Sequence, residues 1–472
     1  MELIEAMLLF LVFIGTFFSI LNSSMVNVAL PTIMIEFAID IRSSTWLYTG
    51  YMLPYAIAMS IFGSLGDIYS PKRIFMLGVF IFAMGSLSCS IAGSFWMLLA
   101  SRTIQALGAA AIMTNSMVLV ITPFEQNKRS AILGWWGMIS SAGSLVGPTL
   151  GGFLTDHIGW HSIFYINLPF AAAILLLGGS YIPSIPKTSS TKIFDYQGSI
   201  YLTVSLVSLL LAIIVGSTNG WLTKTTVPLL GLFLLFACLL FRQESRSSQP
   251  LISLALLQNS SFAATVAVGF FQGAALFGSM LLIPMYLQHV HDFSPTYAGM
   301  LVLPLSISMM IMSPIMGKLA APPNFKLLIV SGMAILAIGI WIFSRLSLQS
   351  PYWLLAAALV TTGIGLGVSS TPLTSNLINV VPQSHMGMAS GLFNMIRYLG
   401  GVIGSTIFGA FIQQRVAAYI IPLTLSGYTA PLAEKMALGK AFPEVFLMGA
   451  FTAAIGMIAA FFTGIPKKIK SL

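Results

Sequence analysis

Charged residues are scarce in this chain. Asp, Glu, Lys and Arg make up 7% of its 472 residues, whereas hydrophobic residues make up 57%. A soluble domain carries roughly 25% charged residues, so this chain cannot surround a hydrophobic core with a water-compatible surface. The composition excludes a soluble globular protein and predicts an integral membrane protein.

Cysteine is also scarce, and catalytic and nucleotide-binding motifs are missing. The two cysteines, Cys89 and Cys238, lie in apolar runs, which argues against a disulfide framework or a metal site. We find no P-loop, no metal-ligand pair and no nucleophile–base set. We therefore expect neither an enzyme nor a cofactor. The formal net charge of +9 is spread thinly over loop positions, which fits membrane topology better than nucleic-acid binding.

Carboxylates are missing from the predicted membrane interior. A buried carboxylate would be the natural proton carrier and the natural counter-charge for a cationic compound. The formal charges expected inside the membrane are Arg102 and Arg397, and such an arginine normally faces a cavity and has a partner. Gln105 shares a helical face with Arg102, so the two could recognise a polar group together; the alternative for Arg102 is a shallow position at the outer interface. The acidic residues all map to loops or helix ends: Glu2, Glu5, Glu36, Asp40, Asp67, Glu125, Asp156, Asp195, Glu244, Asp292, Glu434 and Glu444.

Long apolar runs recur throughout the chain. Their length, about 20 residues, is that of a membrane-spanning helix and not that of a barrel strand. The first five residues lack a basic region, and no small-residue cleavage site follows, so we expect the first helix to be retained. Hydropathy and turn residues predict fourteen spans: 7–31, 44–65, 74–92, 95–121, 130–154, 163–182, 196–217, 226–241, 260–288, 296–317, 327–345, 352–378, 386–414 and 442–463.

Basic residues predict the orientation of these spans. An even number of spans places both termini on one side of the membrane. If that side is the cytoplasm, its loops hold thirteen lysines and arginines and the outer loops hold six. Cytoplasmic loops are usually the richer in these residues, so we expect both termini in the cytoplasm and a location in the cytoplasmic membrane.

The chain also repeats itself at nearly constant offsets. Gly63, Leu65 and Lys72 recur as Gly317, Leu319 and Lys326, and glycines at 143, 147 and 152 recur at 400, 404 and 409. We therefore expect an all-α protein of two six-helix halves, residues 1–183 and 260–472, around a two-helix insert at 184–259. Parallel halves of this kind place a substrate site between them, near the bilayer midplane.

A glycine ladder marks the fifth predicted helix. Residues 143–152 read G-S-L-V-G-P-T-L-G-G, which puts Gly143, Gly147 and Gly151 on one helical face, with Gly152 beside them. Without side chains there, a neighbouring helix can approach closely, and Pro148 favours a bend. A close-packed and bent membrane helix is suited to a rocking transporter.

Residues 63–73 read G-S-L-G-D-I-Y-S-P-K-R and resemble the loop motif between helices 2 and 3 of the major facilitator superfamily. The stretch keeps the aspartate of that motif and its closing Lys-Arg pair, and it departs at Ile68 and Ser70, where a basic residue and a glycine are usual. Further stretches are similar to motifs of the superfamily or of its branch of 14-helix drug:proton antiporters: 21–31, 102–110, 143–152, 160–169 and 195–198.

The resemblance implies a gate. Asp67 ends the second predicted helix, and Lys72 and Arg73 follow it. A carboxylate there can meet a helix N-terminus or a basic side chain and hold the cytoplasmic side shut. The alternative is a loop charge without consequence.

The family usually has an aspartate in helix 1 where this chain has Asn22, and an amide cannot titrate. We therefore expect a preference for neutral or anionic amphiphiles over dications. Protons then use the peripheral carboxylates Asp67, Asp156 or Asp292, or coupling runs by another route.

Two further expectations concern other side chains. His289 and His291, beside Asp292, could sense external protons or form a solvated loop. The lining of the cavity could include Tyr51, Tyr55, Met113 and Trp136.

Three functions follow from these observations. The first is a monomeric secondary exporter of small amphiphilic compounds, with proton exchange as its energy source and the lipid bilayer as its surroundings. The second is a transporter or flippase of an endogenous anionic or zwitterionic solute or lipid, for which the arginines would be the recognition groups. The third is a membrane scaffold or receptor that does not transport. The glycine ladder favours export over the third function.

Overall fold

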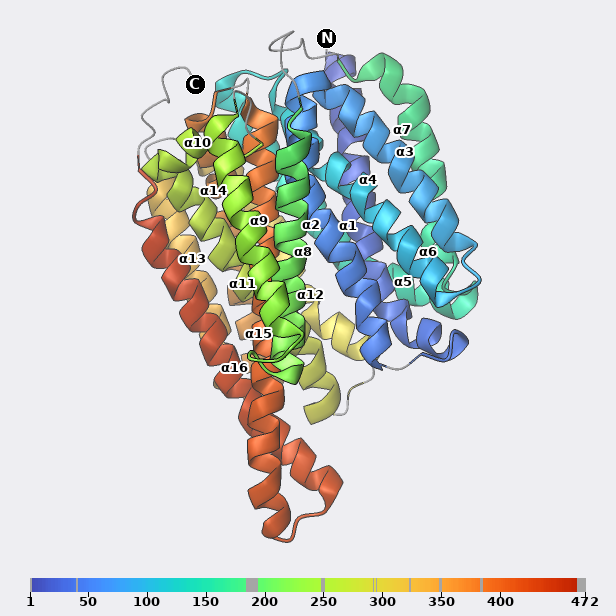
Figure 1. Cartoon of the computed structure of the whole chain (residues 1–472), viewed down its shortest axis with the longest axis vertical. Coiled ribbons are helices and arrows are strands. Elements are labelled where there is room, and N and C mark those ends of the chain that lie inside the picture. Colours follow the sequence, from blue (N-terminus) through green and yellow to red (C-terminus); the bar gives the residue numbers. More distant parts are fainter. Residues whose placement is uncertain are drawn as a thin grey trace.

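The computed structural model consists of helices packed side by side, with no strand among the residues it describes (Figure 1). It describes residues 2–39, 41–183, 194–247, 251–291, 293, 295–321, 324–347, 350–382 and 385–464. The helices are α1 (Glu2–Glu36), α2 (Ile41–Tyr69), α3 (Pro71–Ser90), α4 (Phe95–Ile121), α5 (Gln126–His157), α6 (Ser162–Tyr165), α7 (Asn167–Tyr181), α8 (Tyr196–Asn219), α9 (Thr226–Arg246), α10 (Leu254–Gln258), α11 (Ser260–His291), α12 (Pro295–Leu319), α13 (Phe325–Phe343), α14 (Tyr352–Val380), α15 (Met386–Leu425) and α16 (Ala430–Ala460).

Most of these helices can cross a membrane. Within the described residues, twelve spans are long and apolar enough to do so. Helices α2 and α5 are also long enough to cross a membrane, at 29 and 32 residues, but they are less apolar because glycine, serine and a few charged residues interrupt their sequences. The predicted membrane protein is confirmed at this level.

Helix contacts fall into two groups. Helices α1 to α7 pack mainly on one another, as do α11 to α16. The pairs α2·α15 and α5·α12 join the groups, and α8 contacts both α2 and α15. The helices α8 and α9 therefore lie over the line where the two groups meet (Figure 1).

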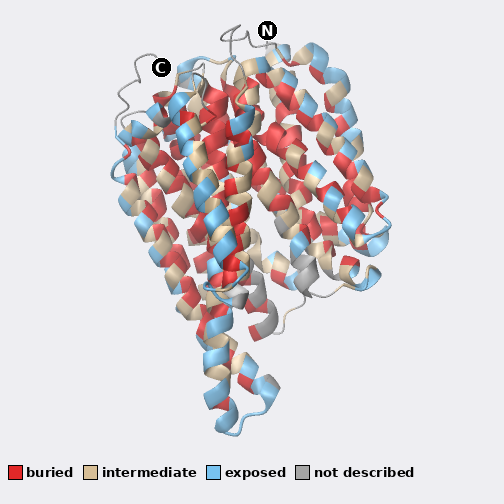
Figure 2. Cartoon of the chain, in the orientation of Figure 1, coloured by how far each residue is buried: buried red, intermediate tan, exposed pale blue. Residues whose placement is uncertain are grey.

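Burial follows the membrane pattern. Buried residues face neighbouring helices, and exposed residues lie on the outer surface (Figure 2). Helix α9 illustrates this pattern, because Leu234, Leu235 and Phe241 are all exposed. Exposed apolar side chains gathered on one helix suit contact with lipid.

The α15–α16 region differs from the sequence-based expectation. The predicted outer loop between residues 414 and 442 is mostly helical, because α15 runs to Leu425 and α16 begins at Ala430. A 40-residue helix is about 60 Å long, which exceeds the roughly 30 Å hydrocarbon core, and the two helices project together beyond the bundle (Figure 1). Glu444 therefore lies within α16 and not at a helix end, and it forms a salt bridge with Arg415.

The beginning of α1 and the end of α16 lie at the same end of the bundle (Figure 1). We call this end the terminal face and the other the opposite face. Since consecutive long helices alternate in direction, α2 ends at the terminal face, where α5 and α15 begin.

Candidate functional site

Asp67 joins the two helix groups at the terminal face. Its carboxylate oxygens accept hydrogen bonds from the backbone N–H groups of Gly387 and Met388, both at 2.8 Å. These residues are in the first turn of α15, where N–H groups have no partner within the helix. A carboxylate is favoured there by the hydrogen bonds and by the helix dipole. The structure thus places Asp67 of the first group on a helix N-terminus of the second.

The other residues of this motif have separate neighbours. Lys72 donates a hydrogen bond to the carbonyl oxygen of Gly179 at 2.8 Å, near the end of α7, where a cation is favoured. Arg73 is exposed.

Glycines allow the two helix groups to approach closely at α2·α15, where Asp67 contacts α15, and at α5·α12. A Cβ on Gly63 would overlap the carbonyl oxygen of Gly387, and a Cβ on Gly317 would lie 2.7 Å from the carbonyl oxygen of Ser130. Gly63 and Gly317 are the repeated positions found in the sequence. The repeat therefore corresponds to two close helix crossings, α2·α15 and α5·α12, which we call the two seams.

The glycine ladder packs within the first group. A Cβ on Gly143 would lie 2.9 Å from the carbonyl oxygen of Phe17, and one on Gly151 would lie 2.9 Å from the Cα of Met25. A Cβ on Gly147 would overlap Ser24, whereas Gly152 has room for one. The expected close packing is confirmed, and the partner helix is α1. In the half of α5 nearer the opposite face, Pro148 lies near Gly299 of α12.

The repeated glycines of the second group pack in the same way. A Cβ on Gly404 would lie 2.5 Å from the carbonyl oxygen of Ala274, and one on Gly400 would overlap Phe270. Helix α15 therefore packs on α11 as α5 packs on α1. Gly409, the third member of the repeat, has no neighbour within 4 Å of such a Cβ.

Arg102 is buried in a cluster of neutral polar side chains. It is 2% exposed, and its Nη1 donates to Asn22 Oδ1 at 2.8 Å and to Gln105 Oε1 at 2.6 Å. Its guanidinium lies 4.0 Å from the ring centre of Tyr51. Arg102 is therefore enclosed by protein groups and does not extend to the molecular surface. The cluster disperses the charge over amide oxygens and an aromatic face without a carboxylate among these partners.

This cluster extends to residues that sequence reasoning missed. Gln105 Nε2 donates to Ser86 Oγ at 2.8 Å, and Asn167 Nδ2 donates to the same oxygen at 3.3 Å. Asn167 falls in the 160–169 motif, so the sequence held a signal for it. Ser86 lies in an apolar helix, and nothing in the sequence distinguishes it from other membrane serines.

A chain of aromatic rings leads from Arg102 into the second group. Tyr51 stacks on Tyr55 with ring centres 5.7 Å apart, and Tyr55 meets Tyr398 edge-on at 4.9 Å. Tyr55 and Tyr398 are also the electrostatic neighbours of Arg397. The Nε of Arg397 is enclosed and has no hydrogen-bond acceptor among the described residues. The partners of Arg102 all belong to the first group, and the Tyr55–Tyr398 contact links this cluster to Arg397 of the second group.

The remaining predicted lining residues are also buried. Trp136 of α5 is buried and donates its indole N–H to Ser116 Oγ at 3.2 Å. Met113 of α4 is buried in the hydrophobic core. His291 ends α11 and lies 3.2 Å from the hydroxyl of Tyr286. Asp292 and the side chain of His289 are outside the described part of the chain, so the proposed histidine cluster stays a prediction.

Similarities to known proteins agree with this architecture. Residues 12–405 match the family model described as Major Facilitator Superfamily. The multidrug resistance protein Stp of Mycobacterium tuberculosis is 34% identical over 415 residues, which cover 87% of this chain and 76% of that protein. The riboflavin transporter RibZ of Clostridioides difficile is 32% identical over 410 residues, covering 86% of this chain and 88% of that protein. The crystal structure of the human organic anion transporter MFSD10 superposes with a TM-score of 0.69 at 15% identity, covering 95% and 99% of the two chains.

Proposed function

Because the chain belongs to the major facilitator superfamily, we propose that it is a secondary active exporter of small hydrophobic and amphiphilic compounds, exchanged for protons across the cytoplasmic membrane. Several relatives carry names of multidrug resistance transporters. The observation that carries the proposal is the contact of Asp67 with the α15 N-terminus. This contact lies at one face only and joins two helix groups, as a gate for alternating access requires.

We further propose fourteen membrane spans with both termini in the cytoplasm. Helices α2 and α5 supplement the twelve apolar candidate spans, because each packs along helices that are long and apolar enough to span. Residues 1–183 and 260–472 form the two halves, and residues 184–259 form the insert. The helix contacts support this division, and the excess of basic residues in the inner loops supports the orientation.

The transport cycle follows from the two seams. With Asp67 on α15, the terminal face is closed, and substrate exchanges with the opposite face. Opening the terminal face requires α15 to leave Asp67 and the glycine crossings to separate. Because Gly63 and Gly387 have no side chains to interlock, the halves can approach and part without repacking a core.

The substrate site is proposed between the halves, at Arg397, Tyr55 and Tyr398, next to the Arg102 cluster. Aromatic rings accept varied hydrophobic molecules with little specificity. The enclosed Nε of Arg397, which has no acceptor in the described part of the chain, favours substrates with an anionic or acceptor group. Neutral and anionic amphiphiles are therefore preferred over dications, since Asn22 supplies no negative charge.

The enclosed Nε of Arg397 also supports a second candidate function, transport of an endogenous anionic or zwitterionic solute or lipid. The similarity to a protein named as a riboflavin transporter is consistent with a physiological solute. Protons would be carried by peripheral carboxylates such as Asp67 or Asp156, and the protein would act as a monomer.

Reconstitution into vesicles tests the proposal. The purified protein is exposed to a pH gradient while uptake of cationic, neutral and anionic dyes is followed, with protein-free vesicles as the control. We expect gradient-dependent movement of neutral and anionic dyes that an uncoupler abolishes. Dye movement that does not depend on the pH gradient would contradict the proposed proton coupling. Rapid transport of a divalent quaternary cation would overturn the proposed charge preference.

A further inference from the structure

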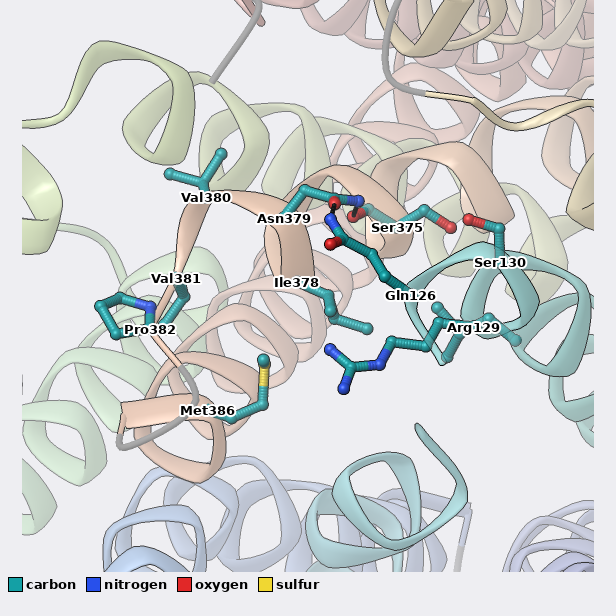
Figure 3. A pocket seen from close by; sticks show the side chains of 11 residues that line it. Gln126, Arg129, Ser130, Ser375, Ile378, Asn379, Val380, Val381, Pro382 and Met386 are labelled. Atoms are coloured by element: carbon teal, nitrogen blue, oxygen red, sulfur yellow. Dashed lines mark hydrogen bonds between the residues drawn. The ribbon is translucent and has the colours of Figure 1, made fainter. Parts of the chain in front are cut away.

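A pocket at the terminal face lies between the two halves. It has a volume of about 240 Å³, which is far more than one water molecule needs. The first turns of α5 form one wall, and the end of α14 with the beginning of α15 forms the other (Figure 3). Gln126 Nε2 donates to Asn379 Oδ1 at 2.9 Å across its rim, so two neutral amides join the halves there.

The pocket contains a cation and no carboxylate. Arg129 is the charged residue among those that line it, and Gln126, Ser130, Ser375 and Asn379 supply the other polar side chains. The Nε of Arg129 donates to the carbonyl oxygen of Phe124 at 3.1 Å. This contact orients the guanidinium, and its terminal nitrogens point into the pocket (Figure 3).

Ser375 provides an independent sign of a missing ligand. It is 1% exposed, yet its hydroxyl has no hydrogen-bond partner among the described residues. A buried polar group without a partner costs about 1–3 kcal/mol. The Ser375 side chain points toward Ser130 across the pocket, and the Arg129 guanidinium lies on the side of the pocket toward Ile378 and Met386 (Figure 3). A ligand that contacts Ser375 and this guanidinium therefore has to extend along the pocket.

The neighbouring helix N-terminus is already occupied. Met386 in the pocket wall precedes Gly387 and Met388, whose N–H groups donate to Asp67. The donors left for a ligand are therefore the Arg129 guanidinium, the serine hydroxyls and the amides. A planar guanidinium with flanking hydroxyls matches the oxygen atoms of a phosphate group.

We propose that this pocket binds a phosphate group, either as free inorganic phosphate or as the headgroup of an anionic lipid. The ligand bridges Arg129 of the first half to Ser375 of the second. Because it contacts both halves, it binds best when the terminal face is closed and stabilises that state. The consequence for transport rests on the proposed alternating-access function, whereas the binding itself does not.

Binding is tested on the purified full-length protein in detergent. Its Tm, followed by intrinsic tryptophan fluorescence, is measured at increasing inorganic phosphate against chloride at equal ionic strength. We expect a saturable rise in Tm, and Arg129→Gln should weaken the apparent affinity by about tenfold or more. Arg129→Lys should restore part of it. Lys128→Gln, which removes an exposed charge next to the pocket, should respond like the wild type.

A second variant keeps the proposal open to refutation if Arg129→Gln fails to fold. Ser375→Ala removes only the unpartnered hydroxyl, so its basal Tm should not fall, and its phosphate response should weaken. An absent response in the wild-type protein, or equal responses in the wild type, Arg129→Gln and Ser375→Ala, would overturn the site. These outcomes do not depend on whether the protein transports.

The source of the phosphate is identified in lipid nanodiscs. If free phosphate is the ligand, it raises the Tm in phosphatidylcholine nanodiscs, and added phosphatidic acid has little effect. If a lipid headgroup is the ligand, phosphatidic acid raises the Tm in an Arg129-dependent manner, and free phosphate adds nothing further. In vesicles, binding of the phosphate ligand should slow dye transport by the wild type and not by Arg129→Gln. If binding depends on Arg129 but does not slow transport, the site stands and only its proposed effect on the terminal face is overturned.

Discussion

The contact of Asp67 with α15 makes a quantitative prediction for Asp67→Asn. The wild-type carboxylate accepts two backbone N–H groups, one on each oxygen, at 2.8 Å. The amide keeps one acceptor oxygen and replaces the other with an N–H₂ donor. One backbone N–H of α15 then loses its partner, and the negative charge at this helix N-terminus is lost.

The size of the effect follows from the lost interactions. A hydrogen bond to a charged group contributes about 1.5–3 kcal/mol. These interactions exist only while the terminal face is closed, so their loss acts on the gate and not on the fold of either half. The equilibrium should therefore move toward the open terminal face by about 10- to 150-fold.

Cysteine labelling measures this equilibrium. Leu133 lies at the wall between the halves and is 2% exposed, so Leu133→Cys should react with a maleimide only when the terminal face opens. The exposed Cys238 is replaced by serine, and Cys89 is buried. Asp67→Asn should accelerate labelling. It should also slow export, because the state with the terminal face closed, in which substrate exchanges with the opposite face, is less populated.

The matched control is Glu125→Gln. Glu125 precedes α5 on the same face and makes no side-chain capping hydrogen bond, so its neutralisation changes the local charge without breaking a contact between the halves. Equal acceleration in both variants would refute a specific role of Asp67. Unchanged labelling in Asp67→Asn would refute the gate.

Three further predictions test the packing and the substrate site. Gly147→Leu places a side chain where α1 leaves no room and should lower the free energy of unfolding by about 1–3 kcal/mol, whereas Gly152→Ala, which has room for its methyl group, should leave the Tm nearly unchanged. Asn22→Asp places a carboxylate on Arg102 and should raise transport of cationic dyes relative to anionic ones; an unchanged ratio would show that this position does not set the charge preference. Arg397→Gln should reduce transport of anionic dyes about tenfold or more relative to neutral ones, and an equal loss for both would indicate a structural role instead.

The helices and their order were predictable because the bilayer dictates them. An apolar run of about 20 residues is long enough for one membrane-spanning helix, and even the short run at 226–241 belongs to a helix, α9, that ends at Arg246. The run at 163–182 is the exception, because it is divided between α6 and α7. The α15–α16 projection was not predictable by the same reasoning. Hydropathy identifies where a segment leaves lipid, but a helix that continues into water gives no hydrophobic signal.

The sequence indicated individual residues of the candidate site but not which of them would contact one another. The sequence indicated the packing face of the 143–152 ladder, but not that α1 would fill it. It also indicated that Arg102 needs a partner, yet the Asn22 amide comes from a helix 80 residues away. Pairings of this kind depend on helix rotation and depth, which a single sequence leaves undetermined.

The two seams show why one of them should dominate the gate. Both are glycine crossings, but Asp67 joins the halves at the α2·α15 seam. At the offset of the repeat, the position that corresponds to Asp67 is Ala321, just after the end of α12. The α5 side of the interface is joined instead by the exposed amide pair Gln126–Asn379 at 2.9 Å. A neutral hydrogen bond contributes about 0.5–1.5 kcal/mol, and exposure to water favours the lower part of that range. Gln126→Ala should therefore shift the labelling equilibrium by only about 2- to 10-fold, and an effect equal to or greater than that of Asp67→Asn would mean that the amide pair, and not the carboxylate, holds the terminal face closed.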